Sequence, residues 1–316
     1  MKKYNHLTSI NILYANVRGI KKKVSSLESA LQSHGTHIAT LVETKLGTIP
    51  PRIEGYHWLT RNKCTGTGGI AILIRDDLAN KVKGTNHLDQ GDSEVLWVEV
   101  ATTPSPTFIG VYYGPQENSP SEEVERQYQT LTNHLITLSQ QGNVILTGDF
   151  NAKVSINHKA TTQKLSRNGK LLEKMLETSK CTAISLQSST GLWTRVNTAN
   201  KNEKSVIDYV ITPENQQSNV EHIQVDVAGA FRIRGDSDSD HNTILTTLKV
   251  KQPRTETSIQ VWDINNKEGW TAFNNQIQEA VKKSHIESYE KLEKEILKAM
   301  EARIGKKKSH STKHTK

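Results

Sequence analysis

Short apolar runs rich in β-branched and aromatic residues recur along the first 250 residues, and turn residues separate them. Runs of this kind with polar flanks are typical of strands that are buried on at least one face. About nine are present, at Ile10–Tyr14, Ile38–Val42, Gly69–Ile74, Val95–Val100, Phe108–Tyr113, Val144–Leu146, Val206–Ile211, Val220–Val227 and Thr243–Val250. The pattern therefore predicts a strand-rich domain.

Helical periodicity interrupts this series of strands. Apolar residues recur at three- and four-residue steps in Glu122–Ser139 and in Lys170–Thr178. Because these helices come singly between groups of strands, the order favours an α/β sandwich of two packed sheets over a doubly wound parallel sheet. The glycine-rich segment Gly66–Gly69 runs into a strand and opens no helix, so we interpret it as a tight turn and not as a nucleotide-binding loop.

The pattern changes after Lys251, where the β-branched runs give way to two amphipathic helices separated near Lys283 and Ser284. The apolar positions of these helices are Trp270, Phe273, Ile277 and Val281, then Tyr289, Leu292, Ile296 and Met300. We therefore expect a strand-rich domain at residues 1–250 and a helical linker segment with a basic tail at 251–316. The periodicity does not say whether the apolar faces dock on the first domain, on a partner or on a missing downstream domain.

Charge and cysteine content narrow the class of protein. A net charge of +8 and a pI near 9.2 favour a polyanionic partner such as nucleic acid. The basic tail from Lys306 to Lys316 is expected to be disordered, as a solvated end or a nuclear address. Cys64 and Cys181 form no CxxC pair, which excludes a thiolate zinc site and a disulfide framework. With no secretory pattern and no apolar run of bilayer length, an intracellular protein without a membrane segment is expected.

Polar side chains follow several predicted strands at or just beyond their ends. Asn16 comes after the first strand, in Asn16-Val17-Arg18-Gly19, and Glu43 ends the second. A carboxylate at the rim of a sheet can ligate Mg²⁺ or Mn²⁺, and a carboxamide can hold a metal-bound water or a neighbouring carboxylate. Taken singly, each is more often a turn or a solvated strand end, so only the combination indicates a site.

The segment Gly148-Asp149-Phe150-Asn151 follows a buried strand and carries a carboxylate and an amide two residues apart. On an extended chain such residues point to the same side, so both are expected to face one phosphate while Phe150 packs inward. Asp149 can take a proton from an attacking water, and Asn151 can donate a hydrogen bond to a phosphoryl oxygen. The alternative is an Asx turn that closes the strand.

Asp208 lies inside an apolar run, where an unpaired carboxylate is costly. His241, just before the last strand, is a suitable partner because a carboxylate fixes the tautomer of an imidazole and favours its charged form. We expect neighbouring strands to bring the two together, with Asp240 beside them as a further metal or water ligand. Hard oxygen ligands and a base are what phosphodiester cleavage requires.

The order of these residues resembles the endonuclease/exonuclease/phosphatase superfamily over residues 8–250. The resemblance is carried by Asn16, Glu43, Tyr113 in Val111-Tyr112-Tyr113-Gly114-Pro115, Gly148-Asp149-Phe150-Asn151, Thr194, Ile207-Asp208-Tyr209 and Ser239-Asp240-His241. Within the superfamily the chain is most similar to the apurinic/apyrimidinic-type endonuclease domain of non-LTR retrotransposons, notably in Asn-Val-Arg-Gly, Gly-Asp-Phe-Asn and the helix start Asn168-Gly169. Gln116 departs from that pattern, which often has Asn there, and this puts the detailed phosphate contact in doubt.

The resemblance implies a four-layer αββα sandwich of two mainly antiparallel sheets and a Mg²⁺- or Mn²⁺-dependent endonuclease that nicks DNA. The site residues that it implies are Glu43, Asn16 and Asp240 for the metal, Asp149 for the water, Asn151 and Tyr113 for the phosphate, His241 held by Asp208 for the transition state, and Thr194 and Ser239 as support. A reverse transcriptase domain would be expected downstream as a partner. The same chemistry stays open to abasic-site repair, RNA, or an inositol or lipid phosphate. A catalytically silent nucleic-acid-binding relic and a protein that acts through its C-terminal helices are the non-enzymatic alternatives.

Overall fold

The computed structural model describes residues 8–47, 49–61, 68–85, 88, 94–158, 161–235, 238–250, 259–263, 266–283 and 289–309. The chain divides into two compact units, residues 1–253 and 254–316. Several sequence-based predictions lie outside the described residues: those on Cys64, on Gly66 and Thr67, on the helix junction at Ser284, and on the tail beyond Ser309.

A seven-stranded sheet forms one half of the larger unit, in the order β12-β16-β17-β1-β2-β4-β3. Its strands are β1 (Ser9–Asn16), β2 (Ile38–Val42), β3 (Tyr56–Arg61), β4 (Ile70–Arg75), β12 (Ser189–Thr190), β16 (Val220–Val225) and β17 (Ile244–Lys249). The pairs β1–β2 and β12–β16 are parallel, and the others are antiparallel. The parallel β1–β2 pair matters for function because it brings two strand ends to the same edge.

A six-stranded sheet forms the other half, in the order β11-β15-β8-β7-β6-β5. Its strands are β5 (Val82–Gly84), β6 (Val95–Val100), β7 (Thr107–Tyr113), β8 (Asn143–Asp149), β11 (Cys181–Ala183) and β15 (Asp208–Pro213). Only its β7–β8 pair is parallel. Both sheets are therefore mainly antiparallel, as expected.

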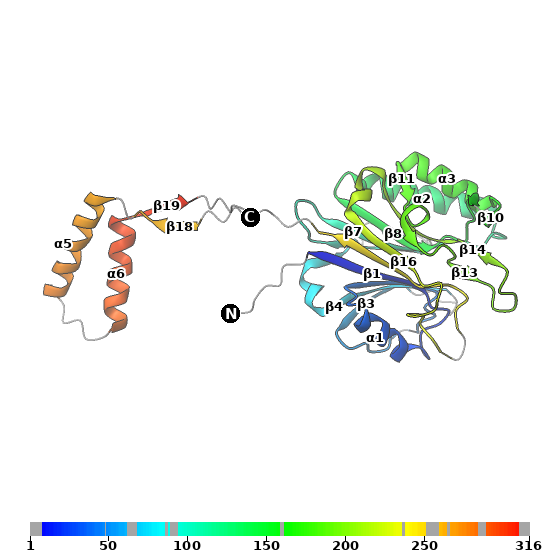
Figure 1. The fold of residues 1–316 in the computed structure, drawn as a ribbon, viewed down its shortest axis with the longest axis horizontal. Coiled ribbons are helices and arrows are strands. Elements are labelled where there is room, and N and C mark those ends of the chain that lie inside the picture. The colour runs from blue at the N-terminus through cyan, green and yellow to red at the C-terminus, as the bar shows by residue number, and fades with distance from the viewer. Residues whose placement is uncertain are drawn as a thin grey trace. The chain divides into compact units, whose positions relative to one another are not determined.

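Helices cover the outer faces of the two sheets. Figure 1 shows α1 (Val24–Ser33) on the outer side of the seven-stranded sheet, and α2 (Ser121–Ser139) with α3 (Arg167–Ser179) on the outer side of the six-stranded sheet. The short elements are η1 (Asp76–Lys81), β9 (Ile156–His158), β10 (Thr161–Gln163), α4 (Ser185–Ser188), β13 (Arg195–Val196), β14 (Lys204–Ser205) and η3 (Glu214–Asn219). The predicted four-layer αββα sandwich is confirmed.

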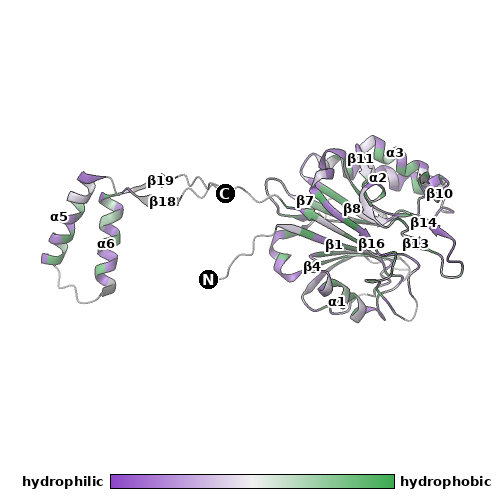
Figure 2. Cartoon of the chain, viewed as in Figure 1, coloured by the Kyte–Doolittle hydropathy of each residue, from purple (hydrophilic) through white to green (hydrophobic). Residues whose placement is uncertain are grey.

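Apolar clusters fill the spaces between the layers. Between the two sheets, Ile12 and Ile72 of the first pack in one cluster with Val98, Val111 and Ile145 of the second. Separate clusters lie beneath α1 and beneath α2 and α3. Figure 2 shows the central strands as mainly hydrophobic and the covering helices as mixed. Each fully buried Ile or Val contributes about 1.5–3 kcal/mol, so the sandwich is a rigid frame for the loops at its edge.

Sequence periodicity located the main strands of both sheets and helices α2 and α3, but it missed helix α1, strand β3 and several short strands. Helix α1 was not predicted, although its buried residues Leu27, Ala30 and Leu31 follow helical spacing. Strand β3 was also missed, because each of its side chains is at least partly exposed and no apolar run marks it. Helix α3 begins earlier than expected, because the hydroxyl of Ser166 caps it by accepting a hydrogen bond from the amide of Gly169 at 3.1 Å.

The smaller unit is a helical hairpin with a two-stranded sheet. Helices α5 (Lys267–Lys283) and α6 (Tyr289–Arg303) confirm the two predicted C-terminal helices. Strand β18 (Ile259–Trp262) pairs antiparallel with β19 (Lys306–Ser309). Disorder was thus wrongly predicted for the start of the basic tail, because this ladder satisfies its backbone groups. Within the described residues, no helix is long and apolar enough to cross a membrane.

Candidate active site

Strand pairing gathers the predicted polar residues at one edge of the sandwich. In the seven-stranded sheet, Asn16 ends β1 opposite Val42, the residue before Glu43. In the six-stranded sheet, Asp149 ends β8 with Tyr113 on one side and Asp208 on the other. Parallel neighbours end at the same edge, and an antiparallel neighbour begins there, so the register alone brings these side chains together.

Asn16 joins the two sheets at this edge. Its side-chain amide donates to Glu43 Oε1 at 2.9 Å and to Asp149 Oδ2 at 3.1 Å. Its carbonyl oxygen accepts from the amide of Arg18 at 3.2 Å, which fixes the orientation of the carboxamide. Asn16 is buried, and it holds two carboxylates close together at the point where they meet the cavity.

Glu43 lies in a tight turn immediately after β2. Its φ of 51° is in the left-handed region, so the chain turns sharply and the carboxylate emerges at the rim. The side chain is 20% exposed and forms an ion pair with Lys45, Oε2 to Nζ, at 3.6 Å. Glu43 therefore keeps an oxygen available to solvent and to a cation.

Asp149 and Asn151 are joined by an Asx turn, and the expected extended geometry is wrong. The amide of Asn151 donates to Asp149 Oδ1 at 3.0 Å, and Asn151 has a φ of 46°. The Asn151 side chain then donates to the carbonyl of Gly114 at 2.9 Å, while Phe150 is fully buried as predicted. Asp149 and Asn151 both line the cavity nevertheless, because Asn151 adopts a left-handed conformation where an extended one was expected.

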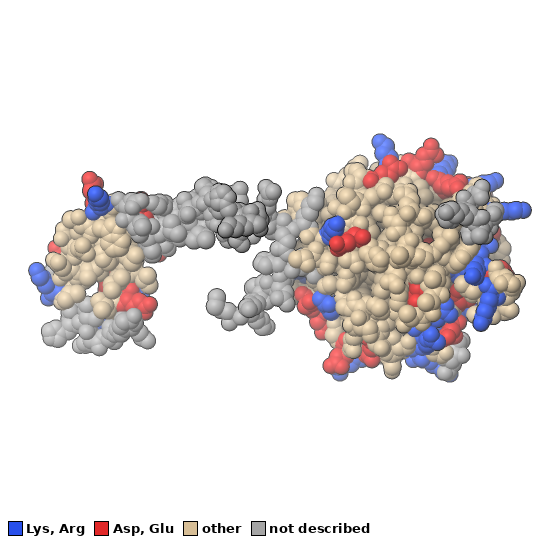
Figure 3. Space-filling model, in the orientation of Figure 1, with Lys and Arg blue, Asp and Glu red and all other residues tan. Residues whose placement is uncertain are grey.

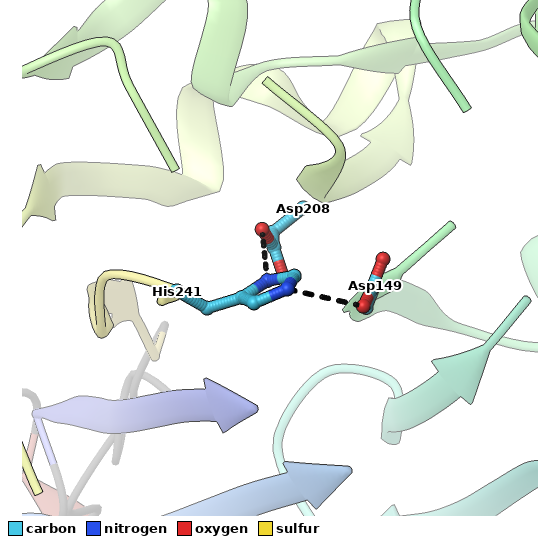
Figure 4. A group of neighbouring side chains, drawn as sticks. All are labelled: Asp149, Asp208 and His241. Atoms are coloured by element: carbon cyan, nitrogen blue, oxygen red, sulfur yellow. Dashed lines mark hydrogen bonds and ion pairs between the residues drawn. The ribbon is translucent and has the colours of Figure 1, made fainter. Parts of the chain in front are cut away.

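His241 pairs with Asp208 across the sandwich. Its Nδ1 lies 2.9 Å from both carboxylate oxygens of Asp208, and its Nε2 lies 3.7 Å from Asp149 Oδ2 (Figure 4). The prediction that neighbouring strands bring the pair together is wrong. Asp208 begins β15 of the six-stranded sheet, whereas His241 precedes β17 of the seven-stranded sheet. The contact is possible because both residues lie at the open end of the space between the sheets.

Two further hydroxyls hold the Asp208 segment. The phenol of Tyr14 donates to Asp208 Oδ1 at 2.6 Å, and both side chains are almost fully buried. Thr194 Oγ1 accepts from the backbone amides of Ile207 and Asp208 at 3.0 and 3.1 Å. The strand that was predicted to begin at Val206 begins only at Asp208, because the amides of Ile207 and Asp208 donate to Thr194 and not to a neighbouring strand. A buried carboxylate with several donors is the stable arrangement for such a charge.

Asp240 stands on the other side of His241 and is bound by arginine. Arg195 Nε donates to Asp240 Oδ2 at 2.7 Å, and Arg18 Nη1 lies 3.8 Å from Oδ1. Asp240 Oδ1 is also 3.9 Å from His241 Nε2. Ser239 is buried, and its hydroxyl accepts from the amide of His241 at 3.2 Å, so it supports the turn that carries the imidazole.

Burial and neighbouring charges shift the pKa values of Asp149 and His241. Burial raises the pKa of Asp149 to about 7, although the neighbouring His241 acts in the opposite direction. Burial alone would lower the pKa of His241, but the carboxylates of Asp208 and Asp149 raise it to about 9. Near neutral pH, Asp149 can therefore exchange a proton, while the imidazole carries a positive charge.

A cavity of about 550 Å³ opens at this edge. Its lining consists of Arg18, Glu43, Lys45, Tyr113, Gln116, Glu117, Asp149, Asn151, Lys153, Ser166, Arg195, Ile207, Asp240 and His241. Six of the predicted site residues are in this lining; Asn16, Asp208, Thr194 and Ser239 lie behind it as buried supports. The structure thus brings all ten predicted residues to one place.

The donor set fits a hard divalent cation. The carboxylates of Glu43, Asp149 and Asp240 all face the cavity, and oxygen ligands of this kind suit Mg²⁺ or Mn²⁺. Ligand atoms of Asp149, Asp208 and His241 also lie within 4.8 Å of one another. That group is already joined by hydrogen bonds, so Glu43 and Asp240, whose ion-pair partners Lys45 and Arg18 are partly exposed to solvent, are better placed to receive a metal.

Sequence reasoning missed several charged or polar residues of the site, among them Tyr14, Arg18, Lys45 and Arg195. Tyr14 lies two residues before Asn16 on the same strand, and this spacing places both side chains on the same face. Arg18, Lys45 and Arg195 each lie within two residues of a predicted site residue, but only Lys45 has a predicted carboxylate, Glu43, close to it in sequence.

The family model that matches the chain is that of the endonuclease/exonuclease/phosphatase family, over residues 13–241. This match includes every residue placed in the site above. A search of curated protein sequences gives no match.

Solved structures with the same fold include nucleic-acid-processing enzymes. The endonuclease domain of TRAS1, a telomere-specific non-LTR retrotransposon, is 18% identical with a TM-score of 0.57, covering 77% of this chain and 100% of that one. The AP endonuclease LMAP from Leishmania major is 14% identical with a TM-score of 0.63, covering 77% and 89%. The 3′ phosphatase NExo from Neisseria, bound to product DNA hairpin, is 17% identical with a TM-score of 0.60, covering 76% and 99%. At these identities the likeness shows the fold.

Proposed function

Because the chain belongs to the endonuclease/exonuclease/phosphatase family, we propose that it is a Mg²⁺- or Mn²⁺-dependent endonuclease that nicks DNA, as in non-LTR retrotransposons. The observation that carries this proposal is the arrangement around His241. An imidazole held by Asp208 presents its Nε2 3.7 Å from Asp149, and both line a cavity that also contains Glu43. These groups match the requirements of phosphodiester hydrolysis.

Each group in the cavity has a role that follows from its contacts. Asp149, buried and with a raised pKa, takes the proton of the attacking water. His241, charged and oriented by Asp208, donates from Nε2 to a phosphoryl oxygen and stabilises the negative charge that develops there. Asn151 and Tyr113, which also line the cavity, contact the phosphate.

Glu43, with Asp240 and Asn16 beside it, would hold the divalent cation. Bound there, the cation supplies Lewis-acid stabilisation of the phosphoryl and leaving oxygens. Asn16 keeps Glu43 and Asp149 at a fixed separation through its two hydrogen bonds, so the metal-binding carboxylate and the base act on the same phosphate. Thr194 and Ser239 hold the backbone that carries Asp208 and His241.

The first alternative is an enzyme of the same chemistry with another substrate, namely an abasic-site repair endonuclease or a phosphoesterase for RNA or inositol phosphates. The observation that favours a nucleic-acid polymer over compact phosphates is the presence of four cations among the residues that line the cavity, Arg18, Lys45, Lys153 and Arg195. A catalytically silent relic is disfavoured because all ten predicted polar residues are retained, and hydrogen bonds hold Asn16, Asp208 and His241 in place.

A plasmid-nicking assay with and without Mg²⁺ tests the proposal. We expect metal-dependent nicking of supercoiled plasmid that exceeds turnover of an abasic duplex, RNA or inositol phosphates. Glu43→Gln should lower both the rate and the affinity for Mg²⁺, because the amide keeps the shape but removes the charge that a hard cation requires. Glu54→Gln, at an exposed position outside the cavity, is the matched control. Absence of nicking at saturating Mg²⁺, or unchanged metal dependence of Glu43→Gln, would overturn the assignment.

A further inference from the structure

The guanidinium of Arg195 is fixed at the rim of the cavity by its own contacts. Its Nε donates to Asp240 Oδ2 at 2.7 Å, and its backbone forms a β-bridge with His241. The side chain is 30% exposed and lines the cavity. Among the described residues, no hydrogen bond to its two Nη groups is found. An arginine held through Nε keeps its other N–H donors for an anion such as phosphate, which the planar guanidinium can bind through two parallel hydrogen bonds.

The position of Arg195 relative to the proposed chemistry indicates which phosphate it would meet. Asp240 stands between Arg195 and His241, with Oδ2 on the guanidinium at 2.7 Å and Oδ1 3.9 Å from Nε2. The guanidinium is therefore one side chain further out than the groups proposed to act on the scissile phosphate. A group at that position is suited to a phosphate next to the reacting one on the same strand.

The charges around Arg195 support a polymer. Arg18 also lies beside Asp240. The short hairpin of β13 and β14 begins with Arg195, and its second strand contains a further cation, Lys204. Figure 3 shows Lys and Arg side chains over the end of the larger unit where these strands lie. Such a cationic rim neutralises several phosphates in succession, whereas a single compact phosphate needs only the central groups.

We propose that Arg195 binds a phosphate adjacent to the scissile one, so that the substrate must be a polynucleotide with at least one flanking phosphate. This inference rests on the proposed nuclease function and deepens it. It makes Arg195 a residue that helps to determine the substrate: a simple phosphomonoester lacks the second phosphate that the guanidinium would hold. The rival reading is that Arg195 serves only to orient Asp240.

Salt dependence of binding gives the first test. Binding of a duplex is measured with the full chain in EDTA by fluorescence anisotropy over a salt series, where no turnover occurs. Loss of one phosphate contact in Arg195→Ala should reduce the slope of log K against log salt by about 0.9 and the affinity by roughly tenfold. Arg195→Lys should keep the slope, and Arg126→Ala, on the far helix α2, should behave as the wild type.

Substitution of single phosphates gives the second and sharper test. A methylphosphonate placed in turn at each phosphate on either side of the scissile position should weaken the wild type at one flanking position. At that position, and at no other, the methylphosphonate should cause no further loss of DNA affinity in the Arg195→Ala variant. A slope equal to that of the wild type, or an equal loss on every duplex, would overturn the inference and assign Arg195 to Asp240 alone.

These tests separate the inference from the proposed function. A chain that fails to nick plasmid but shows the coupled loss in EDTA would refute the endonuclease and support the phosphate contact. A chain that nicks plasmid but shows no coupled loss would support the endonuclease and refute the phosphate contact. If Arg195→Ala lowers the melting temperature, Arg195→Gln repeats the experiment with a side chain that still donates to Asp240 but carries no charge.

Discussion

His241 is held between carboxylates on both of its nitrogens, and this makes its contribution inseparable from that of Asp208. Asp208 is fully buried and bonds to Nδ1, so it fixes the tautomer and orientation of the ring. Nε2 is the nitrogen that remains for substrate, at the cavity. Removing either partner should therefore abolish the same function.

The first prediction tests this unit by a double-mutant cycle. Asp208→Ala, His241→Ala and the double variant should have similar nicking rates, because each removes one charged and oriented imidazole. Single-turnover rates at saturating DNA are the measurement, with circular dichroism to verify folding. Losses that multiply in the double variant would show that the two residues act independently.

The second prediction concerns pH. Asp149 must be deprotonated to accept a proton, so the rate should rise as pH passes its pKa of about 7. His241 must be protonated to donate, so the rate should fall as pH passes its pKa of about 9. The single-turnover profile should be bell-shaped between these values. Asp149→Asn should be about 100-fold slower or worse, with the acid limb missing and DNA binding nearly intact. An acid limb that persists in this variant would contradict the role of Asp149.

The third prediction concerns Tyr14, a positioning residue that touches Asp208 and not the cavity. Tyr14→Phe should lower kcat by about tenfold with KM nearly unchanged, because a hydrogen bond to a buried charge contributes about 1.5–3 kcal/mol to the orientation of the pair. Tyr56→Phe is the matched control: its phenol, at 2.6 Å, bonds a backbone carbonyl far along the same sheet. Equal effects of the two substitutions on kcat would assign Tyr14 to folding alone.

Individual site residues were predictable from the sequence where a polar side chain interrupts or ends an apolar run. Asp149 and Asp208 stand out in this way, and both are buried at the site. Tyr14 was not recognised, because tyrosine is an ordinary member of a buried strand and only the opposite sheet reveals what its hydroxyl meets. Arg195 was missed because its partner Asp240 lies 45 residues away in sequence.

At the scale of elements, the loop after β8 is fixed by the start of α3. Asn168 is buried and donates to the carbonyls of Pro115 and Asn151, at 2.9 and 3.2 Å, so the helix start supports the wall of the cavity. Gly169 approaches the same loop so closely that a Cβ there would lie 2.0 Å from the carbonyl oxygen of Lys153. No L side chain fits without moving the backbone.

The fourth prediction follows from that approach. Gly169→Ala should lower the free energy of unfolding by about 1–3 kcal/mol, since the loop carrying Lys153 or the helix start must shift. Nicking should fall as well, because the loop includes Asn151. Urea denaturation measures the stability, and Gly47→Ala, whose Cβ would meet no atom within 4 Å, is the control. Equal stability of the two variants would show that the start of α3 is adaptable.

Strands were predictable where the chain is buried almost continuously on both faces. Strands β1, β2, β6 and β8 are long apolar runs, and the sequence identified them with shifts of a few residues at their ends. β3 escaped because partial exposure removes the alternation on which strand prediction depends. The conformation after β8 also escaped, because alternation assumes an extended chain, and Asn151 leaves it with a positive φ.

At the scale of the whole molecule, the site exists only because two sheets meet. Asn16 and Tyr14 come from one sheet, and Asp149 and Asp208 from the other. Periodicity along a strand says which face is buried but not which sheet covers it. The sequence therefore predicted that Asp208 pairs with His241, but not that the two residues come from different sheets. The family resemblance supplied the layering that local patterns leave open.

The last prediction concerns the separation of the two compact units. Every residue assigned to the site lies before Val250, whose amide extends the β17–β1 pairing by donating to the carbonyl of Thr8 at 3.0 Å. A chain ending at Pro253, the end of the first unit, should therefore fold and nick plasmid at saturating DNA and Mg²⁺.

Residues 254–316 contain thirteen Lys and Arg against nine Asp and Glu, a net +4 of the chain's +8. The truncated chain should consequently bind DNA more weakly and with a shallower salt dependence. Nicking rates and anisotropy titrations on the two lengths of chain measure both effects. A folded but inactive truncated chain would show that the helical unit takes part in catalysis.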